Sequence, residues 1–281
     1  MVDKLGETTS GEVLTKDILK EVIYKRAREL LVGREIVVER GIKNIDFRLA
    51  LPNFTQIEAQ KVAEGAVADV RTGEWNEVTG SLEKYQSRIR ITYEMKARAL
   101  DDAQLQYYIE GVARGMAQAE DTEIFNVLEA GAWSTTVTAD TAWNAGGDVG
   151  SDVAEALEII LENSNLTAEE LQNIYVVMPA PVYPHVINSV ISGTDTKIID
   201  FMKENFRINF RLTDKLDTDA LVVAKGVETA IHFVYNGADI PTVEEGEVRG
   251  VGYEYLITKY YKTVVPETPN PKIVKITGVY S

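Results

Sequence analysis

The chain has 281 residues, no cysteine and a formal net charge of −15 at pH 7. The absence of cysteine excludes disulfides, thiolate metal ligands and a cysteine nucleophile, and the negative charge disfavours a nonspecific coat on DNA, which depends on clustered Lys and Arg. No apolar run approaches the ~20 residues that cross a bilayer, and the opening MVDKLGETTSGE lacks the basic flank and apolar core of a secretory signal.

The N-terminal third predicts one helix followed by strands. Residues 12–32 place apolar side chains three or four positions apart, which predicts an amphipathic helix, with Gly33 as its C-cap. Residues 34–40 are expected to form a strand. A second strand is expected at 45–52, where apolar and polar residues alternate up to Pro52.

Residues 53–87 mix charges, glycines and isolated large side chains, and they are too polar to form a core. A loop of this length inside a compact domain is uncommon and is usually functional. Alternating apolar residues return at 88–95. Two long strands on either side of a polar excursion predict a protruding two-stranded arm.

The strongest helix signal covers residues 100–129, a segment without proline that would be about 40 Å long. Gly111 and Gly115 lie four residues apart, and each is expected to permit the close approach of another backbone. The predicted apolar stripe consists of Leu105, Tyr108, Ile109, Val112, Met116, Ala119, Glu123 and Leu128.

Asp101 and Asp102 stand side by side where this helix begins. Paired carboxylates serve acid–base and metal chemistry, but acceptors at a helix N-terminus also satisfy free N–H groups and favour the helix dipole. No partner set for catalysis is visible in the sequence. We therefore interpret the pair as the cap of the long helix.

The second half indicates an α+β fold. A glycine-rich loop at 133–151 precedes a helix that Ser151 or Asp152 could cap, and the stretch LQNIYVVMP predicts a buried strand before a short helix near HVINSVI. Beyond residue 205 the sequence is rich in strand-forming stretches without regular βαβ spacing.

No motif for catalysis, cofactor binding or metal binding is present. The sequence lacks a Walker loop, a G-x-S-x-G elbow, an HExxH pair and a calcium loop. His185 and His232 lie far apart and are interpreted as structural. We therefore expect no catalytic residue, no cofactor and no metal site, and we expect a protein that is not an enzyme.

Several stretches carry a resemblance to a known family. The start of an extended loop is resembled by VAEGAVADVRTGEW. A return strand and spine helix are resembled by SRIRITYEMKARALDDAQLQYYIEGVARGMAQAEDTEIF, and the strand and helix of an apical lobe are resembled by LQNIYVVMPAPVYPHV. DALVVAKGVETAIHF and VVPETPNPKIVKITGV resemble closing strands. The family with these elements in this order is the major capsid protein of tailed viruses, which has the Hong Kong 97-like fold and shares it with encapsulin shell proteins.

The resemblance implies an α+β, Hong Kong 97-like capsid fold with an N-terminal arm, an extended two-stranded loop, a long spine helix and an apical α/β lobe. It divides the chain into an N-terminal arm or helix at 1–33, a peripheral domain at 34–52 and 88–131, an extended loop at 53–87, an apical domain at 132–240, and C-terminal strands that return to the peripheral domain at 241–281.

The resemblance also implies a function. The chain would self-assemble through pentamers and hexamers into an icosahedral shell that encloses viral DNA without sequence-specific contact. It would assemble in the host cytoplasm, reside in the virion capsid, and meet portal, scaffold or decoration proteins but no membrane. Arg71, Trp75, Lys84 and Arg88 are the expected assembly contacts of the extended loop.

Two alternatives remain open at this point. The first is an encapsulin-type compartment that encloses cargo enzymes, because the helix at 12–32 is similar to one that lines encapsulins, although the first tryptophan is as late as Trp75. The second is an acidic enzyme whose site converges only in three dimensions. Some capsid proteins cross-link their subunits, but Lys61, Lys84 and Asn270 match the residues involved only by rough position, and we do not predict that activity.

Overall fold

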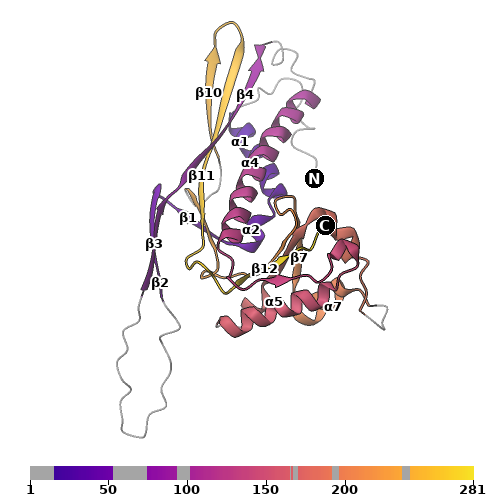
Figure 1. Ribbon diagram of the computed structural model, residues 1–281. Helices are drawn as coiled ribbons and strands as arrows, with labels where there is room; N and C mark the ends of the chain where they lie inside the picture. The colour runs from indigo at the N-terminus through magenta and orange to yellow at the C-terminus, as the bar shows by residue number, and fades with distance from the viewer. Residues whose placement is uncertain are drawn as a thin grey trace, which may run out of the picture.

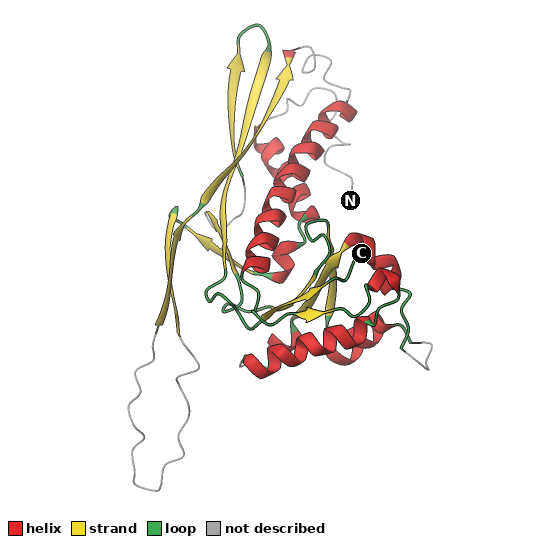
Figure 2. Cartoon of the chain, in the orientation of Figure 1, coloured by secondary structure: helices red, strands yellow, loops and turns green. Residues whose placement is uncertain are grey.

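A computed structural model shows an elongated molecule in which one long helix joins a strand-rich body to a compact lobe (Figure 1). The long helix is α4, Asp102–Ala130, whose 29 residues span about 43 Å. A pair of strands projects away from this body (Figure 2). The structure describes residues 16–52, 75–93, 102–164, 166, 170–191, 196–235 and 241–281.

Two N-terminal helices lie along α4. Helix α1, Lys16–Leu30, confirms the predicted amphipathic helix, and its buried Ile23 and Ala27 share a core with α4. Gly33 is not a C-cap but the first residue of the short helix α2, Gly33–Ile36. A Cβ at Gly33 would lie 3.0 Å from both Asp121 and Ile124, so the glycine lets α2 approach α4 closely.

The buried stripe of α4 differs from the predicted one. Tyr108 is exposed, and the side chain of Leu105 lies outside the described part of the chain. The stripe includes two adjacent positions in each turn because the helix contacts a sheet on one side and α1 or α2 on the other. The buried residues are Ile109, Val112, Ala113, Met116, Ala117, Glu120, Asp121, Ile124, Phe125 and Leu128.

A five-stranded sheet, which we call the peripheral sheet, forms the body. Strand β9 pairs with β1 in parallel and with β11 in antiparallel orientation. The long strand β11 also lies between β10 and β4, and these three strands form a blade whose inner face packs on α1 and α4. The strands are β1 Val38–Ile42, β4 Glu83–Thr92, β9 Ile231–Tyr235, β10 Thr242–Val248 and β11 Gly252–Val264.

The projecting arm is a two-stranded antiparallel sheet of β2, Asp46–Pro52, and β3, Trp75–Ser81. Its register pairs Pro52 with Trp75 and Asp46 with Ser81. A two-stranded arm is therefore present, but the predicted return strand at 88–95 is wrong. Strand β2 pairs with β3, and residues 88–92 belong to β4, which pairs with β11 in the peripheral sheet. Residues 53–74, the remainder of the predicted loop, lie outside the described residues.

The compact lobe contains the second five-stranded sheet, which we call the apical sheet, in the order β5-β12-β8-β6-β7. All five residues of β8 are buried because helices cover both faces of the sheet. The bounds are β5 Val137–Thr138, η2 Trp143–Ala145, α5 Val149–Asn163, η3 Glu170–Gln172, β6 Ile174–Pro179, η4 Ala180–Val182, α6 Tyr183–Val186, α7 Ile198–Phe206, β7 Asn209–Thr213, β8 Ala220–Ala224 and β12 Ile273–Thr277.

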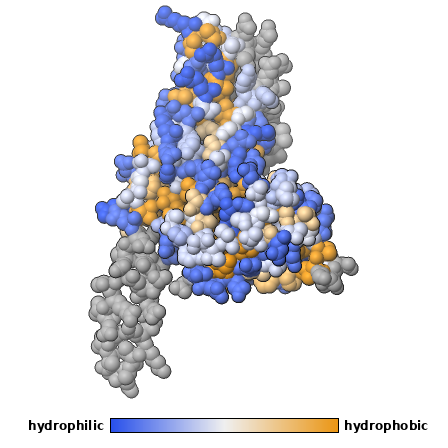
Figure 3. Space-filling view, viewed as in Figure 1, coloured by the Kyte–Doolittle hydropathy of each residue, from blue (hydrophilic) through white to orange (hydrophobic). Residues whose placement is uncertain are grey.

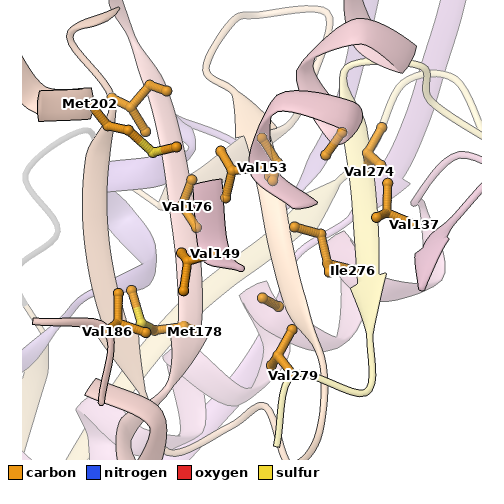
Figure 4. Packing of buried hydrophobic residues seen from close by; sticks show 14 of the residues in the cluster. Val137, Val149, Val153, Val176, Met178, Val186, Met202, Val274, Ile276 and Val279 are labelled. Atoms are coloured by element: carbon orange, nitrogen blue, oxygen red, sulfur yellow. The ribbon is translucent and has the colours of Figure 1, made fainter. Parts of the chain in front are cut away.

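The core of this lobe is aliphatic. Figure 4 shows Val176, Met178, Val274 and Ile276 of the sheet with side chains of α5 and α7, such as Val153. The opposite face of the sheet packs on the C-terminal half of α4. The apical sheet and the spine helix therefore share one continuous interior.

Two further expectations need correction, and two elements have no counterpart in the predictions. The predicted division at residues 240 and 241 is wrong for two strands, because β9 belongs to the peripheral sheet and β12 to the apical sheet. The cap of α5 is Asp148, whose Oδ1 accepts from the N–H groups of Gly150 and Ser151, whereas Asp152 accepts from the Trp143 indole. Helix α7 and strand β10 were not predicted.

Candidate assembly surfaces

Aromatic stacking holds the base of the arm on the body. Phe47 of β2 stacks on Phe233 of β9 with ring centroids 4.2 Å apart, and Leu49 and Val78 are buried in the same cluster. A Cβ at Gly80 would lie 2.8 Å from the Phe47 ring, so only glycine leaves room for the stack. The arm is therefore fixed at its base, while its far end lies well away from the body (Figure 1).

The four expected assembly contacts fall in different places. Arg71 lies outside the described residues, and Trp75 is the first residue of β3, with a side chain outside the description. Lys84 and Arg88 lie on β4, so they belong to the blade and not to the loop. The Arg88 side chain is 66% exposed, with its Nη1 3.9 Å from Glu254 Oε2.

The predicted cap of the spine helix lies at the edge of the description. Asp101 lies outside the described residues, and Asp102 is the first residue of α4, with a side chain that is not described. The position of Asp102 fits the predicted start of the helix. The capping role of the pair stays a prediction.

Gly111 and Gly115 do not pack closely against this chain. Both are exposed, and no described atom lies within 4 Å of a Cβ placed at either position. Within the described part of the chain the predicted close approach of another backbone is therefore wrong, because α1 and the blade contact α4 along other faces. Contact of this face with a neighbouring subunit stays a prediction.

A buried ionic cluster, absent from the sequence predictions, joins the spine helix to the peripheral sheet. Glu120 of α4 is fully buried and forms ion pairs with Arg34 of α2 and Lys259 of β11. His232 Nε2 of β9 lies 3.1 Å from Glu120 Oε1, and His232 Nδ1 lies 2.9 Å from the Thr263 hydroxyl. Four separate elements therefore meet at one carboxylate.

The charges around Glu120 decide its ionisation. Burial alone would raise its pKa, but the Lys259 ammonium, the adjacent His232 ring and the Arg34 guanidinium together lower the pKa below its ordinary value. Glu120 is therefore ionised at neutral pH. A charge this deeply buried is tolerated only because cations and donors surround it.

The neighbouring carboxylate, Asp121, caps α2. Its two oxygens accept from the backbone N–H groups of Val32 and Gly33 at 3.2 and 2.8 Å. Burial raises the pKa of Asp121, and these two hydrogen bonds oppose the rise. The adjacent acids in AQAEDTEIF therefore have two separate structural roles, and both roles attach the N-terminal segment to the spine helix.

Glu123 lies one turn further along α4 and is poorly solvated. The Thr263 N–H donates to its Oε1 at 2.7 Å, whereas its Oε2 has no hydrogen-bond partner among the described residues. Burial raises the pKa of Glu123 to about 7. The nearby Tyr261 hydroxyl is also buried without a described partner, and its ring stacks on Tyr85 at 4.0 Å.

An apolar groove lies exposed on the compact lobe, between α5 and α7. Its volume is about 530 Å³, and Leu161 and Phe206 at its margins are both more than half exposed. Glu158 and Glu162 also line it. Apolar side chains exposed in this way are typical of surfaces that contact other proteins.

Metal binding and membrane spanning each place definite requirements on the described residues. Within them, no three His, Asp or Glu side chains are placed to bind a metal ion, and no helix is long and apolar enough to span a bilayer. His185 is exposed on α6, far along the chain from the buried His232 of β9, and Asn270 is buried, with its amide bonded to Glu228 O. The features that remain are surfaces and structural clusters.

The comparisons with known proteins agree with this picture. A family model described as phage capsid protein matches residues 76–272. No curated protein matches the chain by sequence. Solved structures with similar folds include a virus-like particle from Pyrococcus furiosus, with a TM-score of 0.65 at 12% identity, covering 92% of this chain and 97% of the other.

Two further structures extend the comparison. The capsid of cyanophage P-SCSP1u has a TM-score of 0.60 at 15% identity, covering 98% of this chain and 93% of the other. An encapsulin from Synechococcus elongatus PCC 7942 has a TM-score of 0.57 at 11% identity, covering 97% and 92%. The family match spans well over half of the chain, and the structural matches share its fold. The chain therefore belongs to the phage capsid protein family and is a capsid shell protein with the Hong Kong 97-like fold.

Proposed function

We propose that identical copies of this chain assemble through pentamers and hexamers into a closed icosahedral shell that encloses viral DNA. The observation that supports this proposal most directly is the arm of β2 and β3, which projects from the body (Figure 1) and whose described apolar side chains Phe47, Leu49 and Val78 pack on it. An isolated two-stranded sheet is marginally stable in water, so the far part of the arm gains stability by lying on another subunit.

The proposed role is structural and involves no reaction. DNA is held without sequence-specific contact, and the net charge of −15 disfavours tight binding of the shell protein to phosphates. Assembly takes place in the host cytoplasm, where portal, scaffold or decoration proteins join the same shell. The subunit's main partner is a second copy of itself.

The experiment removes residues 53–74, which join β2 to β3, and leaves the described β2–β3 sheet intact. Pro52 and Trp75 pair directly, so a two-residue Asn-Gly turn can replace residues 53–74. We expect this variant to keep the far-UV circular dichroism and thermal midpoint of the wild type, while electron microscopy shows no shells. Normal shells from the shortened chain would refute the role of the arm.

A compartment that encloses cargo enzymes is the second candidate. It is supported by helix α1 near the N-terminus and by the similarity to the Synechococcus elongatus encapsulin. Nucleic acid absorbance in purified particles supports the virus capsid. Particles free of nucleic acid that contain a second protein in fixed ratio support the compartment.

A further inference from the structure

The three-stranded blade has two open edges. Strand β11 lies in its centre and pairs with β4 on one side and with β10 on the other. Among the described residues, neither β4 nor β10 pairs with a strand on its outer side, and both edges are visible in Figure 1. Open edges of this kind attract other strands or other subunits unless charges prevent it.

The two edges carry opposite charges in the same transverse rows. The register places Arg88 of β4 opposite Leu256, and Leu256 opposite Glu244 of β10, so one row ends in a cation at one edge and an anion at the other. The edge of β4 also exposes Lys84 and Arg90. The edge of β10 also exposes Glu245 and Glu247.

These charges are accessible to a partner. The side chains of Arg88 and Arg90 are more than half exposed, although both lie near Glu254 on β11. Glu244 is exposed as well. Hydrophilic side chains cover much of this part of the molecule in the view of Figure 3. Strand β4 carries three cations and one acid, Glu83, whereas the chain as a whole has 44 acidic residues against 29 basic ones.

The signs of the charges select the geometry of contact between copies. A two-fold contact through β4 would bring the basic edge against the same basic edge of the copy, and a two-fold contact through β10 would bring two acidic edges together. Like charges opposite each other destabilise a pairing. A contact between β4 of one copy and β10 of the next joins opposite charges and is heterologous, which is the type of contact that closes rings.

We propose that the basic β4 edge of one subunit binds the acidic β10 edge of a neighbouring copy. This inference rests on the proposed function, because it requires that the chain self-assembles. It names a surface for Lys84 and Arg88 that differs from the extended loop. Because the contact is exposed, salt screens it, and wild-type assembly weakens as the ionic strength rises.

The test uses charge reversal on each edge and on both edges. Arg88→Glu alone and Glu244→Arg alone each place like charges in the contact, and the double variant restores opposite charges with the signs exchanged. Lys203→Glu and Glu204→Arg on the exposed face of α7 are matched controls, because they change the net charge equally, away from the blade. Circular dichroism checks that each subunit folds.

Light scattering measures the protein concentration at which shells form, with 50 and 500 mM NaCl compared. At low salt we expect each single edge variant to form shells only at a protein concentration at least about fivefold higher than the wild type needs. The double variant should form shells at a concentration close to that of the wild type, and the α7 controls should match the wild type. Shells from the single variants at wild-type concentration would overturn the inference and leave the proposed function standing. Failure of the double variant to recover would also overturn it. Absence of shells from the wild type would overturn the proposed function itself.

Discussion

Replacing Glu120 by glutamine removes one negative charge from the interior while keeping the size of the side chain. Arg34 and Lys259, whose side chains are only 7% exposed, then lose their ion pairs with the Glu120 carboxylate, although Arg34 keeps its ion pair with Glu39 at 3.3 Å. Two buried cations would then share less negative charge than before. We therefore expect this single change to loosen the attachment of the N-terminal segment to the spine helix.

The size of the effect follows from burial. Removing one partner of a buried ion pair costs about 3–5 kcal/mol, because the remaining charge stays desolvated. The amide oxygen of the introduced glutamine would still accept one hydrogen bond, which favours the lower end of that range. For a chain of this length, about 3 kcal/mol corresponds to a fall of roughly 5 °C in Tm.

The matched control is Glu110→Gln on the same helix. Glu110 binds Arg26 with an O–N distance of 2.6 Å, but those two side chains are 30% and 46% exposed. An exposed pair contributes no more than about 1 kcal/mol. Thermal unfolding of unassembled subunits, followed by circular dichroism, compares the two variants. Equal shifts in Tm would refute the view that Glu120 is a structural centre of the fold.

Three further predictions concern the spine helix. Burial keeps Glu123 protonated in the folded subunit at pH values where the unfolded chain has lost the proton, so the contribution of Glu123 to stability falls as the pH rises from 4.5 to about 7. Glu123→Gln removes this decline. The Tm of the variant minus that of the wild type should therefore grow across that pH window and then level off. Gly111→Ala and Gly115→Ala should each stabilise the isolated subunit by about 0.5–1 kcal/mol in a denaturant titration. If the helix face that carries these glycines contacts a neighbouring subunit, both variants should also reduce the yield of shells. An unchanged yield of shells would exclude that contact. Changing Asp101 and Asp102 to Ala should lower Tm and disturb assembly in electron micrographs, whereas intact shells with unchanged Tm would contradict the capping role.

Elements with strong local patterns were predictable from the sequence. The amphipathic repeat predicts α1, and the long stretch without proline predicts α4. The alternation of apolar and polar residues at 45–52 predicts β2. The hydrophobic run ALVVA gives the buried β8. Helix α7 was missed because its nine residues, IIDFMKENF, are too few for a firm periodic signal in a region dominated by strands.

Local sequence patterns predict neither strand β10 nor the sheets to which β9 and β12 belong. TVEEGEV exposes both faces of an edge strand, so it lacks the apolar alternation that marks a half-buried strand. The sheet to which a strand belongs depends on pairing across more than 100 residues, as between β4 and β11. Local sequence carries no record of such partners.

The buried ionic cluster shows the same limit for the site. Glu120 lies 86 residues from Arg34 and 139 from Lys259, and each residue alone resembles a solvated surface charge. The only local signal was the pair of acids in AQAEDTEIF, which resembled a family pattern without a physical reason. The structure supplies the reason, since Glu120 and Asp121 hold α2 against α4.

Cryo-electron microscopy of the purified full chain tests the shell function most directly. We predict closed icosahedral particles in which the β2–β3 arm of each subunit lies on the surface of a neighbour. Particles whose arms contact only their own subunit would contradict the proposed role of the arm. Monomers or small open oligomers under all assembly conditions would contradict the shell function itself.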